Sequence, residues 1–252
     1  SVKSLTFLGD MFDGVQCPCI LLQLVATGKP LSTVGMRIED RTRTFIIAME
    51  RTVVPENFSF RMTDEEYRVL EKIKNSIPVC YLADHADFAL GIVTGNNKKF
   101  LSAEKTEHSE MVLKGTDICK YHINPAKQYL RFEPEQFQQV APLEIYRAPE
   151  KLLYRFISNQ LVVAYDDRQM LSLNSCNIVI PKIEGMQIKY ILAILNSSVS
   201  QFVYQKEFHS IKVLRAHMEH IPIPRVGKAI QNEIIAMTEP LICGMGKEAA
   251  ET

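Results

Sequence analysis

The sequence predicts a protein of the mixed α+β class, rich in short β-strands and carrying one long packing helix. Three β-rich segments, at 151–157, 161–165 and 177–181, follow one another with polar turns between them, as strands joined by tight turns do. Apolar residues then recur at helical spacing from Met186 to Tyr204, which predicts a helix with one face buried against a sheet. Near the start of the chain, residues 15–25 are almost continuously apolar, which is typical of a strand buried on both faces in an α/β sheet.

The first sixty residues predict a hairpin followed by one more strand. Residues 1–14 form an apolar strand that ends in Asp13-Gly14, a dipeptide favoured in hairpin turns. Residues 15–25 form the return strand, and residues 44–49 form another strand. A globular chain that opens halfway through such a hairpin is unusual. We therefore interpret this part as the cut end of a larger domain.

Two further helices are predicted, one before and one after the long packing helix. Thr63 followed three residues later by Glu66 is a capping box, and an apolar face continues from there to an end between Asn75 and Pro78. Helical periodicity resumes at 226–239, and the apolar residues of its second half offer a surface for another protein.

Short strands and turns fill the middle of the chain. The sequence Thr94-Gly95-Asn96-Asn97 predicts a hairpin turn in which Gly and Asn adopt positive φ. Residues 111–121 predict a strand, a Lys-Gly turn and a second short element. A strand at 129–132 and a Gln-rich helix or loop at 133–140 follow.

Composition indicates a globular protein without a membrane segment. The 252 residues include 29 basic and 29 acidic side chains, so the net charge is zero, which counts against a dedicated nucleic-acid-binding protein without excluding one. No apolar run approaches the roughly 18 to 20 residues of a membrane span, and no basic-then-apolar leader opens the chain. We expect a cytoplasmic protein with no membrane partner. The six cysteines lack CxxC spacing, which predicts buried free thiols instead of zinc ligands or disulfides.

The motifs of common catalytic sites are absent from the sequence. There is no GxGxxG, GxxxxGK[ST] or GxSxG, and no Asn-Pro-Pro-aromatic motif; Asn124-Pro125-Ala126 is a turn. No acidic residue has a lysine two positions later, as a common type of metal-dependent nuclease needs. His217 and His220 are three residues apart but lack further ligands, and Asp166-Asp167 predicts a turn. We therefore predict no catalytic and no metal-binding residue.

The segment that follows the long helix is the most basic part of the chain. Residues 204–228 contain five Lys or Arg against two Glu, and Pro222 and Pro224 end any regular structure there. A cationic, hydroxyl-bearing loop held on the end of a rigid helix suits contact with phosphate groups. The alternative interpretation is a charged loop that is simply solvated. The turn at 94–99 has the same two interpretations, because its Thr, Asn and Lys side chains could place hydrogen-bond donors beside a base edge or a phosphate.

Six segments, taken in order, form a recognisable series. They are 88–100 (FALGIVTGNNKKF), 112–121 (VLKGTDICKY), 149–157 (PEKLLYRFI), 173–180 (LNSCNIVI), 190–204 (YILAILNSSVSQFVY) and 212–224. Together they resemble the TaqI-like C-terminal specificity domain. That module is the target recognition domain fused behind adenine-specific DNA methyltransferases of restriction-modification systems, including type IIG enzymes, and it is akin to the recognition domains of type I specificity subunits. The resemblance runs from about Thr63 to Pro224, and the neutral net charge is its main departure.

The resemblance implies that polar loops of this chain contact double-stranded DNA. By position, the loops at 94–99 and 174–177 would lie near the duplex, and 206–217 would supply contacts to phosphates and bases. The DNA-binding residues implied are Thr94, Asn96, Asn97, Lys98, Lys99, Lys114, Asn174, Ser175, Asn177, Lys206, His209, Ser210, Lys212, Arg215 and His217.

The resemblance also implies a division of the chain and a catalytic partner. Residues 1–60 would be the remnant C-terminal strands of an α/β methyltransferase domain with a linker, residues 61–225 the recognition domain, and residues 226–252 a C-terminal helix. The methyltransferase catalytic domain would belong to the same polypeptide and transfer a methyl group from S-adenosylmethionine to adenine N6 after base flipping. This chain would bind no cofactor itself, and methyl transfer cannot be assigned to it alone.

Two other classes of function stay open from the sequence. One is a restriction nuclease-associated fragment, since some relatives join cleavage to methylation. The other is a protein-interaction or assembly domain without direct DNA contact, for which the helix at 230–241 is the candidate surface.

Overall fold

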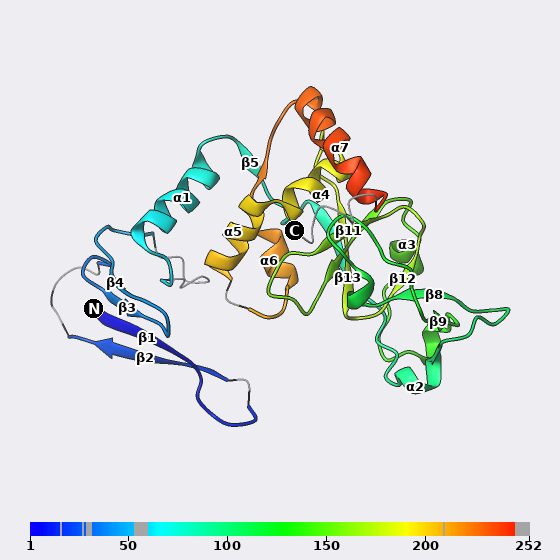
Figure 1. Ribbon diagram of the computed structural model, residues 1–252, viewed down its shortest axis with the longest axis horizontal. Coiled ribbons are helices and arrows are strands. Elements are labelled where there is room, and N and C mark those ends of the chain that lie inside the picture. The colour runs from blue at the N-terminus through cyan, green and yellow to red at the C-terminus, as the bar shows by residue number, and fades with distance from the viewer. Residues whose placement is uncertain (16, 27, 29–31, 53–59, 209, 245–252) are drawn as a thin grey trace. The chain divides into compact units, whose positions relative to one another are not determined.

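The computed structural model describes residues 1–15, 17–26, 28, 32–52, 60–208 and 210–244. The chain divides into two compact units, Ser1–Ser76 and a second unit that begins at Ile77. Figure 1 shows the elements of both.

The first unit is built on a four-stranded sheet with the order β2-β1-β3-β4. Strands β1 and β2 form the antiparallel hairpin that the sequence predicts, and β3 lies parallel to β1 on its other side. A small core is made by Leu5, Met36, Ile38, Ile47 and Phe60. The strands are β1 (Val2–Asp10), β2 (Pro18–Leu24), β3 (Arg37–Glu39) and β4 (Thr44–Ile46).

The helix of the first unit begins where its capping signal predicts. In α1 (Asp64–Asn75), the Thr63 N–H donates to the Glu66 carboxylate at 2.8 Å, and the Glu66 N–H donates to the Thr63 hydroxyl at 3.3 Å. The buried Arg51 pairs with Asp64 at 2.6 Å. Because the cap and this ion pair act on the same turn, they fix the start of α1 against the segment that follows β4.

Strand β2 exists as predicted, but the prediction that it is buried on both faces is wrong. Ile20, Leu21, Leu22 and Leu24 are 57%, 61%, 46% and 63% exposed. Burial on both faces requires a layer on each side, and β2 is an edge strand of this sheet. Side chains on one face of the hairpin, including Leu5, Phe7 and Ile20, instead line an apolar groove of about 600 Å³ within the first unit.

The second unit consists of a central antiparallel sheet between a smaller sheet and a layer of helices. The central sheet has the order β11-β10-β13-β6, and the three strands predicted at 151–157, 161–165 and 177–181 are its first three members. Helix α4 packs on β10 and β11. The strands are β6 (Ala86–Ala89), β10 (Lys151–Arg155), β11 (Val163–Asp166) and β13 (Cys176–Pro181), and α4 spans Ile188–Asn196.

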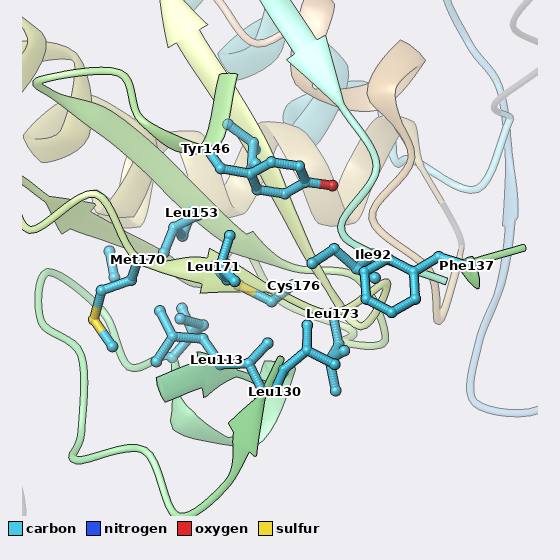
Figure 2. Close-up of a cluster of buried hydrophobic side chains, with 14 residues drawn as sticks. Ile92, Leu113, Leu130, Phe137, Tyr146, Leu153, Met170, Leu171, Leu173 and Cys176 are labelled. Atoms are coloured by element: carbon cyan, nitrogen blue, oxygen red, sulfur yellow. The ribbon is translucent and has the colours of Figure 1, made fainter. Parts of the chain in front are cut away.

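A buried hydrophobic cluster lies between the central sheet and the smaller sheet (Figure 2). Leu153, Cys176 and Ile178 come from the central sheet, whereas Leu113 and Leu130 come from the smaller one. The order of the smaller sheet is β12-β8-β9-β7, formed by β7 (Leu101–Ser102), β8 (Glu110–Leu113), β9 (Tyr129–Leu130) and β12 (Leu171–Ser172). The strands predicted within 111–121 and 129–132 are thereby confirmed.

Short elements complete the second unit. They are β5 (Val79–Cys80) paired with β14 (Ile223–Pro224), the helical turns α2 (Asn97–Phe100), α3 (Leu143–Tyr146) and α6 (Arg215–Glu219), and the 3₁₀ turns η1 (Gly115–Asp117) and η2 (Pro134–Gln136). The predicted helix at 226–239 is confirmed as α7 (Lys228–Ile242), which packs on α4 (Figure 1).

The single helix predicted from Met186 to Tyr204 is two helices. Helix α4 ends at Asn196, and α5 (Ser198–Glu207) begins after Ser197, whose hydroxyl accepts a hydrogen bond from the Ser200 N–H at 3.1 Å. The buried Asn196 amide exchanges hydrogen bonds with the backbone of Val163, at 2.8 and 3.1 Å. The chain therefore breaks because a serine caps a new helix while Asn196 binds the central sheet.

The hairpin turn predicted at Thr94 to Asn97 is also different in the structure. Gly95 has the expected positive φ of 75°. Asn96, however, has φ −150° and is the N-cap of α2, with its side chain accepting from the Lys99 N–H at 3.2 Å. The Asn side chain satisfies an exposed backbone donor here, which is the other common use of Asn in a turn.

All six cysteines are free thiols, as predicted, but only Cys80 and Cys176 are buried. Within the described part of the chain, no three His, Cys, Asp or Glu side chains are grouped as a metal site would need. Across those same residues, no helix combines the length and apolar character needed to cross a bilayer.

Candidate functional site

The turn that carries Asn174 and Ser175 is held in place by two glycines from distant parts of the second unit. A Cβ atom at Gly91 would lie 2.2 Å from the Leu173 carbonyl oxygen, and one at Gly115 would lie 2.5 Å from the Ser175 carbonyl oxygen. Both distances are far below van der Waals contact, so only glycine fits at either position. The Gly115 N–H also donates to the Ser175 hydroxyl at 3.0 Å. The turn is therefore fixed from two sides.

This fixed turn meets the loop at 94–99. The Asn174 N–H donates to the Ile92 carbonyl at 3.1 Å, and Ile92 and Leu173 are neighbours in the buried cluster of Figure 2. A small pocket of about 270 Å³ is lined by residues next to these two in the sequence, including Val93 and Asn174. Two loops that are eighty residues apart in the sequence thus share one cavity, which is lined by Val93, Thr94, Gly95, Asn97, Gln138 and Asn174.

Side chains of the 94–99 loop have different roles around this pocket. Thr94 is only 4% exposed, and its hydroxyl donates to the Asn97 amide oxygen at 2.6 Å. Lys99 reaches the Gln136 amide oxygen at 3.3 Å, whereas Lys98 is exposed. The loop therefore presents Asn97 and two ammonium groups to solvent, while Thr94 orients Asn97 from inside.

The basic segment is connected to the same turn through a short two-stranded ribbon. The Phe156 N–H donates to the Ser175 carbonyl at 3.0 Å, and the Phe156 carbonyl accepts from the Val213 N–H at 2.7 Å. The Ser158 N–H donates to the Ile211 carbonyl at 2.9 Å. A continuous run of backbone hydrogen bonds therefore links the Asn174-Ser175 turn to the part of the chain that contains Lys212.

Within the basic segment, exposure separates surface residues from structural ones. Lys212 and Arg215 are exposed. Arg215 pairs with Glu219 at 2.7 Å and lies 5.2 Å from the centre of the Phe88 ring. Lys206 lies 5.8 Å from the Phe202 ring at the end of α5. The partly buried Ser210 accepts from the Lys212 N–H at 3.0 Å, and His209 lies outside the described residues.

His217 is occupied by contacts within the protein. Its ring stacks on Phe208 with 4.5 Å between ring centres, and its Nδ1 atom accepts from the Leu214 N–H at 3.2 Å. Burial lowers the pKa of His217, with a smaller contribution in the same direction from His220, while a hydrogen bond to the Lys212 backbone raises it. The neutral ring therefore supports the basic segment from inside, and a contact to DNA is not its evident role.

Two other residues implied by the resemblance, Asn177 and Lys114, are not fully exposed. Asn177 is 4% exposed in β13, where its amide oxygen accepts from the Gly91 N–H at 3.3 Å. Its side chain is thus part of the interior, next to the turn that it helps to hold. Lys114 is half-buried, and its N–H donates to Asp117 at 2.8 Å.

Sequence reasoning did not identify Gln138 or Gly91, and it assigned Gly115 only to a turn. Isolated glycines inside strand-like runs are a known signal of close backbone approach, so Gly91 and Gly115 could have been found. No local pattern marks Gln138, because its position follows from the pairing of Val93 with Gln139, in a distant segment.

Comparison with known proteins shows what part of this chain is similar to. Residues 110–223 match the family model described as the TaqI-like C-terminal specificity domain. The fold is similar to that of the type IIL restriction-modification enzyme MmeI, solved in complex with DNA, with a TM-score of 0.58, 9% identity, and coverage of 99% of this chain and 39% of that one. The family match therefore confirms, for residues 110–223, the resemblance found in the sequence.

Other matches are more remote. The HsdS subunit from Thermoanaerobacter tengcongensis gives a TM-score of 0.45 at 14% identity, with coverage of 75% of this chain and 46% of that one. The type IIG restriction endonuclease BpuSI gives 0.43 at 10% identity, with coverage of 94% and 38%. This chain spans less than half the length of each of these proteins. No curated protein matches it.

The family match begins at Glu110 and ends at Ile223. The resemblance read from the sequence began near Thr63, so the segment at 88–100 lies outside the matched residues. Its place beside the matched domain comes from the structure, through the Gly91 and Ile92 contacts with the Asn174-Ser175 turn.

Proposed function

We propose that this chain is the sequence-specific DNA recognition module of an adenine-N6 DNA methyltransferase in a restriction-modification system. The observation that carries the proposal is the hydrogen-bonded run from Gly115 through Ser175 and Phe156 to Val213. It joins two polar turns to the most basic segment of the chain. In this arrangement lysines contact phosphates and set the register, while amide and hydroxyl groups read base edges.

The family and the fold support the proposal. The matched family is described as a specificity domain, and MmeI, which has a similar fold, was solved in complex with DNA. Of the residues implied by the resemblance, we assign the DNA contacts to the exposed ones: Asn96, Asn97, Lys98, Lys99, Asn174, Lys212 and Arg215. Lys114, Ser175, Lys206 and Ser210 are partly exposed and flank them.

We further propose that a methyltransferase catalytic domain of the same polypeptide performs the chemistry in the cytoplasm. Residues 1–60 are then the last strands of that domain, residues 61–225 the recognition domain, and residues 226–252 a C-terminal helix. The catalytic domain flips the adenine and uses S-adenosylmethionine, which supplies the methyl group. The role of this chain is to hold the duplex in the register that brings the target adenine to the catalytic domain.

Competition binding with the intact protein tests the first proposal. A duplex is selected from a random pool, and its Kd is measured between 50 and 200 mM salt, on the order of the range in which phosphate contacts weaken strongly. Lys212→Gln should reduce the slope of log Kd against log salt by about one, while leaving the selected sequence unchanged. Lys127→Gln is the control, because Lys127 is an exposed lysine outside the segments 94–99, 174–177 and 206–217. Binding that ignores both sequence and salt refutes the proposal.

A second function, assembly with another domain or protein, is favoured by the exposed face of α7. The buried Gln231 amide bonds to the Gly185 and Val226 carbonyls, at 2.9 and 3.0 Å. These bonds turn the polar side of the helix inward and leave Ile230 and Met237 49% and 69% exposed. An apolar stripe at this spacing suits packing against another helix.

Association measurements separate this function from DNA recognition. Ile230→Glu combined with Met237→Glu should weaken assembly in light scattering while the Kd for the selected duplex stays the same. Unchanged assembly would exclude α7 as the contact surface. Loss of DNA binding in the same variant would show that α7 belongs to the recognition surface instead.

A further inference from the structure

The ribbon formed by residues 156–158 and 211–213 presents an apolar side chain that the proposed DNA contacts do not include. Ile157 and Lys212 are direct partners in an isolated antiparallel bridge. The hydrogen bonds flank them, from the Val213 N–H to the Phe156 carbonyl and from the Ser158 N–H to the Ile211 carbonyl. Ile157 and Lys212 therefore form a non-hydrogen-bonded pair, whose side chains lie close together on one face of the ribbon.

That face of the ribbon points to solvent. Ile157 is 62% exposed and Lys212 is exposed, whereas Val213, on the opposite face, is 1% exposed. Two more aliphatic side chains of this region, Ile211 and Leu214, are 53% and 42% exposed. Exposed aliphatic side chains therefore flank Lys212 and Arg215 in a segment that has five Lys or Arg against two Glu, and Ile157 is the one that shares a face of the ribbon with Lys212. A partner of this patch must combine negative charge with an apolar group.

DNA offers that combination in its major groove. An aliphatic side chain has no donor or acceptor, so among base edges it gains only from the 5-methyl group of thymine. A two-stranded β-ribbon is narrow enough to enter the major groove. A lysine next to the aliphatic side chain can then reach the phosphate backbone or the N7 and O6 acceptors of a neighbouring guanine.

We propose that Ile157 is a specificity-determining residue that contacts the 5-methyl group of one thymine in the major groove, with Lys212 beside it on the duplex. This inference rests on the proposed DNA-recognition function. Ile157 suits the role because its β-branched side chain has few rotamers. The ribbon is also tied to the Asn174-Ser175 turn by the Phe156 N–H to Ser175 carbonyl bond of 3.0 Å. The methyl contact and the polar contacts at 174–175 are therefore held in one register.

Thymine-to-uracil replacement tests the contact, because it removes the methyl group and leaves base pairing intact. The intact protein first selects a duplex from a random pool, and each thymine of that duplex is then replaced singly by uracil. One replacement should weaken binding by the wild-type protein on the order of fourfold, as burial of one methyl group predicts. Ile157→Ala should bind the thymine duplex with a similar loss and should no longer respond to that replacement. Ile46→Ala, at an isoleucine 64% exposed in the first unit, should keep the full response.

The outcomes separate this inference from the function on which it rests. Failure to select any duplex refutes DNA recognition itself. A selected duplex without an A·T pair, or a response to uracil that persists in Ile157→Ala, leaves DNA recognition intact and overturns the role of Ile157. Strong fluorescence of 2-aminopurine within the bound duplex that Ile157→Ala abolishes also overturns it, because Ile157 would then unstack a base step as a wedge.

Discussion

The two units of this protein each contain a four-stranded sheet, and the sheets differ in what covers them. In the first unit, apolar residues of β2 such as Leu21 are more than half exposed. In the second unit, Leu152 and Leu153, on opposite faces of β10, are completely buried, because α4 packs on one side and the smaller sheet on the other. Similar apolar sequences therefore reach opposite degrees of burial. The difference arises from the layers that the rest of the chain supplies.

The central sheet of the second unit also buries an ion pair. Among the described residues, the sheet of the first unit contains no such pair. The Lys151 ammonium lies 2.5 Å from the Asp166 carboxylate, and both side chains are completely buried. Lys151 also donates to the Tyr146 carbonyl at 2.6 Å, and Asp166 accepts from the N–H groups of Arg168 and Met170. Removal of either residue would leave the other charge in the interior without its counter-ion.

The largest effect is expected from breaking this pair. Asp166→Ala should lower the free energy of unfolding of the second unit by about 3 to 5 kcal/mol, because Lys151 would be left charged and unpaired in the interior. Asp87→Ala removes an exposed pair with Lys182 and should cost at most about 1 kcal/mol. Denaturant unfolding followed by tyrosine fluorescence measures both. Equal losses in the two variants would contradict the burial argument.

The sheets themselves can be compared by matched truncations. Leu153→Ala should cost about 2 to 5 kcal/mol, since it opens a cavity in the buried cluster. Leu21→Ala, on an exposed strand, should change the free energy of unfolding by less than about 0.5 kcal/mol. The free energy of unfolding of each variant is measured by denaturant titration under the same conditions. If Leu21→Ala destabilises as much as Leu153→Ala, then β2 is covered in solution, and the difference between the sheets disappears.

A smaller loss is expected at the glycine that supports the recognition turn. Gly91→Ala places a methyl group against the Leu173 carbonyl, a contact of 2.2 Å before relaxation, and should cost about 1 to 3 kcal/mol. It should also weaken binding to the selected duplex, because Asn174 moves with the turn. Gly227→Ala, where an added Cβ meets nothing within 4 Å, is the control. Normal DNA affinity in a folded Gly91→Ala protein would separate the turn from recognition.

Local signals predicted the parts of this fold that are determined locally. The capping box of Thr63 and Glu66 predicted the start of α1, and short apolar runs predicted three of the four strands of the central sheet. The same local logic failed at Ser197, because an apolar face continues through the break while the serine caps a new helix. The two consecutive serines after Asn196 are the local signal of this break, because serine is a preferred N-cap residue.

The candidate site depends on pairing that no local pattern contains. The sequence identified Asn174 and Lys212 as polar loop residues, and the structure connects them through Phe156. The sequence could not show that Asn177 faces inward and Ile157 outward. Alternation along a strand predicts two faces but does not indicate which face is covered. Thr94 likewise combines a polar side chain with a buried position that only the fold reveals.

The smallest effect concerns the acid sensitivity of the second unit. Burial lowers the pKa of His217 below its usual value near 6.5, so the folded protein favours the neutral ring more than the unfolded chain does. The contribution of His217 to the free energy of unfolding is fully present above about pH 6.5, the pKa of the unfolded chain. It decreases as the pH drops through this value and is lost completely below the lowered pKa of the folded protein. His217→Gln should therefore flatten the decline in melting temperature between about pH 7 and pH 5. His108→Gln, at an exposed histidine, should retain it. The first unit contains no histidine. If its unfolding transition shows the same dependence on pH as that of the second unit, then groups other than His217 cause the acid sensitivity.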